Sequence, residues 1–199
     1  MTTLADIRTR LRKDLHDTDS GGYRWSDAQL DRHIEHALDE MNLAIPRELT
    51  ATIATTPGSR DLSLASLTTL IEVEAAEYPV GEFVPAYIGF SRWADTVSLH
   101  IDTEPDGDSA KLYYTARHTL DGSGSTLPVF LEDLVLTGAG AYAALELGAF
   151  AIDQLNTGGA AVPDHYASWA RARLTAFRQL LHTHGRKNRL RARRLYVPA

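Results

Sequence analysis

The chain has 199 residues, no cysteine and a formal net charge of −6. Its length fits one domain, or one domain with a sizeable insertion, and a chain of this size buries a core without disulfides. The composition excludes disulfides and thiolate metal sites, and no signal peptide is expected, because the first fifteen residues hold no continuous apolar stretch. The charge is uneven: residues 186–199 hold six basic residues and no acidic one, which leaves −12 for residues 1–185.

Two amphipathic helices are predicted at the start of the chain. Residues 3–16 place apolar side chains on one stripe, with Thr3 in position to cap the first turn. Residues 26–45 carry the clearest helix start, because Ser26 and Gln29 form a capping box and Trp25 precedes the cap as half of a hydrophobic staple. Pro46 is expected to end this second helix.

Residues 50–118 are predicted to form a small inserted sheet of four to six strands. The segment 50–56 is rich in β-branched residues, and a Pro-Gly-Ser turn follows it. The segments 96–101 and 110–116 alternate polar and apolar residues, and the turn-rich connector DTEPDGDS lies between them. We therefore expect these two segments to pair as a β-hairpin.

A long helix is predicted at residues 128–152, because Pro128 suits a first helical turn and a broad apolar face follows it. Acidic residues at positions 132, 133 and 146 interrupt the segment, so we do not expect it to span a membrane. Each interior glycine costs about 1 kcal/mol relative to alanine, so the glycines need a reason. Small residues let another helix approach closely, either within the domain or in a neighbouring subunit. The candidates for subunit packing are Gly138, Gly140, Ala141, Ala144 and Gly148.

A last helix is predicted at residues 163–182, and the basic segment 186–199 follows Gly185. This segment could be a solvated terminus, a nucleic-acid arm that neutralises phosphates, or a peptide arm that docks on a protein surface. Apolar residues interleaved with the arginines favour the third interpretation, because a segment that orders on docking needs anchors to offset the lost entropy. The expected contact residues are Arg186, Lys187, Arg189, Leu190, Arg191, Arg193, Arg194, Leu195, Tyr196 and Val197.

Three local patterns approach ligand sites without completing them. Residues 102–108 resemble the first half of a calcium loop, but the twelfth position is Tyr113 instead of glutamate. His33 and His36 could share a zinc ion, but no third ligand is evident, so we interpret them as surface histidines. The glycine-rich segment 122–124 lacks the lysine of a phosphate-binding loop. The sequence therefore predicts no enzyme, no cofactor and no metal site.

Two stretches carry a recognisable order of motifs. The first is LADIRTRLRKDLHDTD followed by RWSDAQLDRHIEHALDEMN: a short basic helix, a tryptophan, Ser-Asp, and a helix of the form L-x-x-x-I-x-x-A-L. The second follows the sheet and reads YYTARHTLDGSGSTLPVFLEDLVLTGAGAYAALE. This order, over nearly the whole chain, resembles the head-to-tail connector (adaptor, or head completion) proteins of tailed bacteriophages. Glu35 departs from the pattern, since many relatives carry asparagine there.

The resemblance implies a structural virion protein in the neck between head and tail, assembled in the host cytoplasm. Such adaptors form a ring beneath the portal protein, usually of twelve copies, which extends the DNA channel and offers a platform to a tail or stopper protein. Residues 186–199 would then dock on the portal, and residues 50–118 would face the tail side or the outside of the ring. An acidic body suits a channel through which DNA slides. The alternative is a nucleic-acid-binding protein that uses the basic tail.

The predicted fold class is α+β and mainly α: a four-helix bundle with an inserted small antiparallel β-sheet domain and an extended C-terminal arm. Its predicted divisions are residues 1–49 for an N-terminal helical hairpin, 50–120 for the β domain, 121–185 for the second half of the bundle, and 186–199 for the arm.

Overall fold

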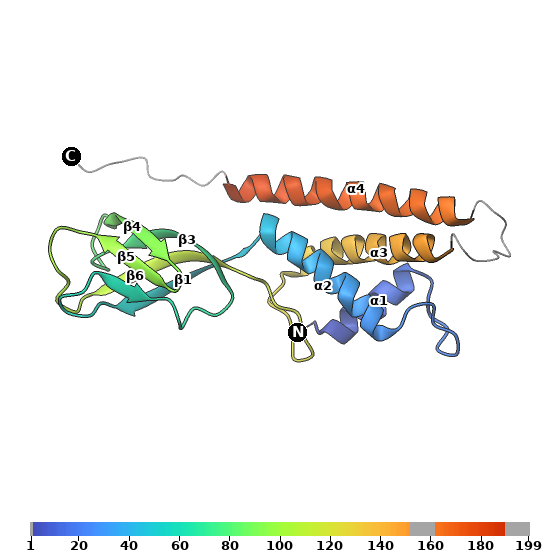
Figure 1. Cartoon of the computed structure of the whole chain (residues 1–199), viewed down its shortest axis with the longest axis horizontal. Coiled ribbons are helices and arrows are strands. Elements are labelled where there is room, and N and C mark those ends of the chain that lie inside the picture. The colour runs from blue at the N-terminus through green and yellow to red at the C-terminus, as the bar shows by residue number, and fades with distance from the viewer. Residues whose placement is uncertain (1, 152–161, 190–199) are drawn as a thin grey trace. The chain divides into compact units, whose positions relative to one another are not determined.

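The computed structural model describes residues 2–151 and 162–189, and it combines four helices with a six-stranded antiparallel sheet (Figure 1). The predicted mixture of helices and antiparallel strands is confirmed. The chain forms two compact units: Met1–Ile45 with His118–Ala199, and Pro46–Arg117. All four helices belong to the first, which we call the helical unit, and all strands belong to the second, the β unit.

The first two helices begin at reciprocal caps. In α1 (Leu4–Asp14) the Thr3 hydroxyl accepts a hydrogen bond from the Asp6 amide, and in α2 (Asp27–Ala44) the Ser26 hydroxyl accepts one from the Gln29 amide. In each case the side chain of the third helical residue accepts a hydrogen bond from the cap backbone amide. The predicted caps are therefore confirmed, and each satisfies amides that the first turn leaves without an intrahelical partner.

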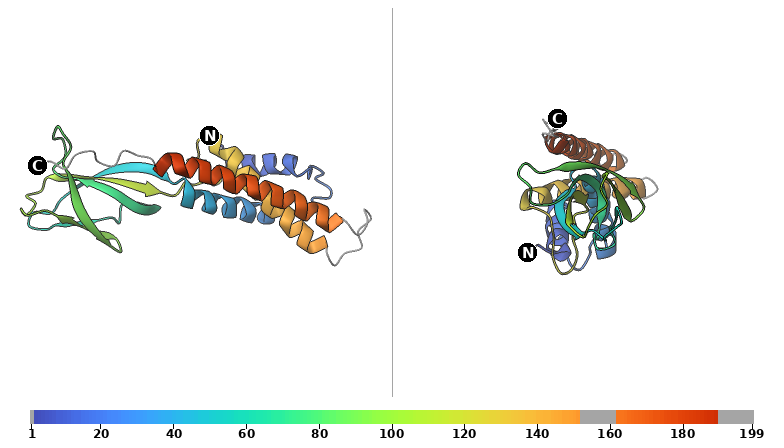
Figure 2. Two further views of the ribbon diagram at one scale, coloured as in Figure 1. Left: turned by 90° about the horizontal axis from the view of Figure 1, so that it is seen from above. Right: turned by 90° about the vertical axis from the view of Figure 1, so that its left-hand side faces the viewer.

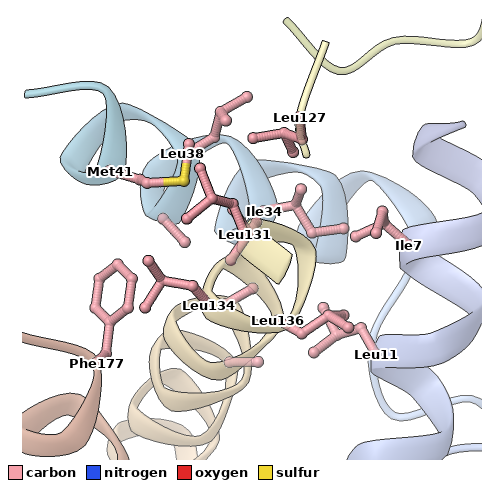
Figure 3. Close-up of a cluster of buried hydrophobic side chains, with 14 of the residues drawn as sticks. Ile7, Leu11, Ile34, Leu38, Met41, Leu127, Leu131, Leu134, Leu136 and Phe177 are labelled. Carbon is pink, nitrogen blue, oxygen red and sulfur yellow. The ribbon is translucent and has the colours of Figure 1, made fainter. Parts of the chain in front are cut away.

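The core of the helical unit is formed around α3 (Val129–Ala151), which contacts the other three helices. Figure 2 shows α4 (Val162–Arg189) running beside it. Figure 3 shows Phe177 of α4 and leucines of α3 meeting side chains of α1 and α2 in one buried cluster. Among the described residues this cluster has eighteen buried members, which makes it the larger of two hydrophobic cores.

Helix α4 continues beyond the predicted end at residue 182. It passes through Gly185 and ends at Arg189, so residues 186–189 are helical instead of extended. Gly185 is buried, and a Cβ atom there would lie 2.9 Å from the carbonyl oxygen of Ala44. The glycine therefore permits a close approach of α4 to α2, and this contact outweighs the poor helix propensity that suggested a stop.

The β unit is one sheet of strand order β1-β6-β3-β4-β5-β2, with every described pair antiparallel. Its ten-residue core gathers side chains from β2, β3, β5 and β6 and from the segment after β2. The strands are β1 (Arg47–Ala54), β2 (Asp61–Ser63), β3 (Leu70–Glu77), β4 (Tyr87–Trp93), β5 (Thr96–His100) and β6 (Ser109–Ala116).

The predicted hairpin between residues 96–101 and 110–116 is wrong. Strand β5 pairs with β4 and β2, whereas β6 lies between β1 and β3. The hairpin is instead β4–β5, whose register pairs Trp93 with Thr96, so the turn residues are Ala94 and Asp95. Ala94 has a φ of 49°, a conformation that usually calls for glycine or asparagine. Residues typical of a tight turn are therefore missing at the β4–β5 turn, and they occur instead in the longer connector before β6.

Candidate functional site and assembly surfaces

The incomplete ligand patterns lie apart in the fold. Residues 102–108 connect β5 to β6, and the Asp106 carboxylate accepts a hydrogen bond from the Asp108 amide at 3.3 Å, as in a local turn. Gly122 and Gly124 lie in a second turn, in which the Asp121 carboxylate accepts from the amides of Ser123 and Gly124. Within residues 2–151 and 162–189, no group of three or more histidine, aspartate or glutamate side chains could hold a metal ion.

His33 is buried, so its interpretation as a surface histidine is wrong. Its Nε2 atom forms a hydrogen bond with the carboxylate of Glu146 on α3, which also accepts from Arg32 at 2.8 Å. Burial lowers the pKa of His33, although the hydrogen bond to Glu146 opposes that shift. Burial raises the pKa of Glu146, but the hydrogen bonds from His33 and Arg32 outweigh it, and the net shift is downward. The pair joins α2 to α3 as a structural contact.

A second polar contact joins the same two helices. The rings of His36 and Tyr142 stack with centroids 4.1 Å apart, and the Tyr142 hydroxyl donates to Glu40. Burial, with the hydrogen bond to Glu40, raises the pKa of Tyr142 to about 12. The phenol therefore stays neutral near pH 7, and the stack is a packing contact between α2 and α3 instead of an acid–base pair.

The arginines of α1 join the helices of the helical unit. Arg8 donates to Asp31 through both Nε and Nη2 at 2.7 Å, and Arg12 is buried with hydrogen bonds to Asp17 and Asp27. Arg10 reaches Glu132 and Asp133 of α3, each at 2.6 Å. Paired guanidiniums in fixed geometry explain why a basic first helix packs against acidic side chains of α2 and α3. The sequence showed these charges but not their partners.

The small residues of α3 make contacts within their own subunit. A Cβ atom at Gly138 would lie 2.9 Å from the Phe177 ring and 3.0 Å from Ala37, and one at Gly140 would lie 3.6 Å from Leu11. Ala141, Ala144 and Gly148 are also buried. Close packing inside one subunit therefore explains Gly138 and Gly140, and a role of the five residues in packing against a neighbouring subunit stays a prediction.

Several large apolar side chains remain on the surface of each unit. In the β unit Phe83 is fully exposed and Trp93 is 87% exposed. In the helical unit the exposed set is Tyr23, Leu43, Val129, Phe130, Phe150, Trp169 and Leu180. Apolar side chains that are exposed singly are normal on protein surfaces, so these residues become candidates for partner contact only where several lie on one face. No sequence pattern indicated them, because exposure depends on which faces the tertiary fold leaves open.

Only the first part of the predicted C-terminal arm lies within the described residues, where it belongs to the end of α4. Arg186, Lys187 and Arg189 belong to the helix, and residues 190–197 lie outside the described residues. Of the helices described, none combines the length and apolar character that crossing a membrane would require.

Comparison with known proteins gives a family and similar solved structures. The family model described as SU10 adaptor protein matches residues 2–195. No curated protein matches the chain. Among solved structures, a chain in the neck of an empty GTA particle computed with C6 symmetry is similar, with 17% identity over 84% of this chain and 88% of that chain. The TM-score of that match is 0.30, so it carries no argument about fold or assembly.

Proposed function

Because the chain belongs to the SU10 adaptor protein family, we propose that it is a structural adaptor that forms a ring beneath the portal and joins the head to the tail. The family match over nearly the whole chain is the observation that carries this proposal, and it agrees with the resemblance to head-to-tail connectors and with a location in the virion neck. The proposal gives the protein no catalytic role. The helical unit, acting as a four-helix bundle, would build the ring, and twelve is the copy number we propose.

The interior of each subunit supports a structural role. The polar groups that could have served chemistry are engaged between helices: His33 with Glu146, Tyr142 with Glu40, and Arg10 with two carboxylates of α3. Such contacts fix helices relative to one another, which is what a load-transmitting ring subunit requires. The acidic character of residues 1–185 suits a channel lining past which DNA moves without adhering.

In this proposal the C-terminal segment docks on the portal, and a tail or stopper protein binds the opposite side of the ring. Residues 190–199 hold three arginines beside Leu195, Tyr196 and Val197, so charge and apolar anchors alternate in one short peptide. Fully extended, ten residues reach about 33–36 Å, enough to extend well beyond the end of α4. The exposed Phe83 and Trp93 of the β unit are candidates for the tail-side contact.

The test is removal of residues 190–199, compared with the full chain for binding to the portal protein of the same phage. We expect binding to be lost while the helical circular dichroism signal stays unchanged, because the last described helix ends at Arg189, before the removed segment. A matched variant replaces Leu195, Tyr196 and Val197 with serine and keeps every arginine. Retained portal binding by the truncated chain would contradict the arm's role.

The competing function, nucleic-acid binding through the basic end, makes a different prediction. Duplex DNA would then bind the full chain with an affinity that falls steeply with salt, and truncation would reduce the slope. The serine variant separates the two functions, because it removes the apolar anchors and leaves the phosphate-binding charges in place. Loss of portal binding in that variant, with any DNA binding unchanged, supports the adaptor.

A further inference from the structure

Two helices of the helical unit carry opposite charge. Helix α2 holds five acidic residues and one basic residue, whereas α4 holds one acidic and six basic residues. Figure 1 shows α4 along one side of the helical unit, with α1 on the opposite side. Because the two helices belong to one subunit, every copy presents both a cationic and an acidic helix.

The outward face of α4 is unlike an ordinary solvated helix face. Ser168, Ala172 and Ala176 are exposed and recur every fourth residue, so they form one stripe of small, uncharged side chains. Trp169 and Leu180 are each about two-fifths exposed, at 40% and 42%. A half-exposed indole beside an uncharged stripe is a feature that a covering surface would bury to advantage. Within the described residues the Arg173 guanidinium lies 4.8 Å from the centroid of the Trp169 ring, and the indole still stays 40% exposed.

Charged groups near these faces remain available for a contact. Arg171 of α4 and Glu35 of α2 are exposed, and the side chain of neither has an ion-pair or hydrogen-bond partner among the described residues. On α2, Leu43 is 80% exposed near the C-terminal end of the helix. Each face thus combines an unpaired charge with an exposed apolar side chain, and the signs of the two charges are opposite.

We propose that the outward face of α4 in one copy packs against the outward face of α2 in the next copy. This inference rests on the proposed function, because a ring needs heterologous contacts that use two different surfaces of each subunit. Opposite charges favour this pairing and oppose the alternatives, since α4 against α4 would bring two cationic helices together. Duplex DNA on α4 would use the basic residues but would leave the acidic α2 face and its exposed Leu43 without a partner.

Cross-linking can test this contact, because the chain has no cysteine and the introduced thiols are the only ones that a maleimide can modify. The variant Glu35→Cys with Ala176→Cys places one thiol near the middle of α2 and one near the middle of α4. Mid-helix positions lie opposite each other whether the helices run parallel or antiparallel. The assay treats the full chain, alone and mixed with the portal protein, with a short bifunctional maleimide and reads the covalent products by size.

We expect the double variant to give a ladder of linked chains, because each copy links to a neighbour on both sides, and each single variant to give no ladder. The matched control combines Ala176→Cys with Thr9→Cys, which is exposed on α1, and should give no ladder. A ring without the ladder, or efficient dimers from Ala176→Cys alone, would overturn this inference and leave the adaptor role standing. A chain that forms no ring with the portal would contradict the proposed function itself, as would a monomer whose α4 binds duplex DNA.

Discussion

The helical unit and the β unit are stabilised in different ways. The helical unit closes around eighteen described core residues, with glycines at close helix contacts and ion pairs between helices. The β unit has ten buried core residues, and Phe83 and Trp93 of that unit face solvent. The difference teaches where substitutions are costly: close helix contacts leave little room for altered side chains in the core of the helical unit, whereas exposed side chains of either unit can vary to suit a partner.

The largest expected effect comes from emptying the helical core. Phe177→Ala should lower the free energy of unfolding by about 3–5 kcal/mol, because the fully buried ring leaves a cavity among several helices. Hydrogen exchange read by mass spectrometry should show faster exchange in α3 and α4 and unchanged exchange in β6. The matched control, Phe83→Ala, should change stability by no more than about 0.5 kcal/mol, since that ring is fully exposed. An equal increase in hydrogen exchange in both units of the Phe177→Ala variant would contradict the separate stabilisation of the two units.

Substitutions of glycine by alanine compare how tightly the two units are packed. Gly138→Ala should destabilise the helical unit by about 1–3 kcal/mol, because its Cβ atom would clash with Phe177 and Ala37. Gly140→Ala, two residues away, meets only Leu11 at 3.6 Å and should be neutral or stabilising by up to about 1 kcal/mol. In the β unit, Gly89→Ala would meet the movable His100 side chain at 3.3 Å, so we expect a smaller loss than at Gly138. Denaturant midpoints of the three variants test this order.

Lowering the pH should destabilise the helical unit before it destabilises the β unit. The pKa shifts resolved for acidic and histidine side chains among the described residues, all downward, belong to this unit: Asp6, Asp27, His33, Asp121 and Glu146. A carboxylate with a lowered pKa stabilises the fold above its ordinary pKa and loses that contribution as the pH falls through the folded value.

His33 contributes to acid sensitivity at a higher pH than the carboxylates. Because burial lowers its folded pKa, the unfolded chain binds the proton first, and stability declines as the pH falls below the ordinary value of 6.5. His33→Gln should therefore make the melting temperature depend less on pH as the pH falls from 7 to below the ordinary histidine value of 6.5. The control is Phe83→Ala in the β unit, where the pH dependence should stay that of the unaltered chain, because the replaced side chain is exposed and does not titrate. An equal slope in the two variants would count against the pair with Glu146.

The sequence predicted what local patterns determine and missed what tertiary contacts determine. Capping boxes at Thr3 and Ser26 lie within three residues, so the starts of α1 and α2 were readable. Strand order depends on distant pairing, and the turn at Ala94 carried no glycine to reveal the β4–β5 hairpin. Gly185 gave a false helix end, because the reason for a glycine there is the backbone of Ala44 in another helix.

The surfaces proposed for assembly also differ in whether local sequence or tertiary packing reveals them. The charge of the C-terminal segment was evident from composition, but the exposed faces of α2 and α4 could be identified only after packing had fixed which residues are buried. The buried position of His33 shows the reverse case, since the amphipathic pattern predicts a surface residue at this position. Its partner Glu146 is 113 residues away, beyond the reach of periodicity.

The central claim is that copies of this chain build a ring which the portal holds through the C-terminal segment. Electron cryo-microscopy of the full chain mixed with its portal protein tests this most directly. The account predicts a closed ring of twelve copies, with α4 of one subunit against α2 of the next and residues 190–199 in contact with the portal. Monomers bound to DNA, or a ring whose residues 190–199 fold back on their own subunit, would contradict it.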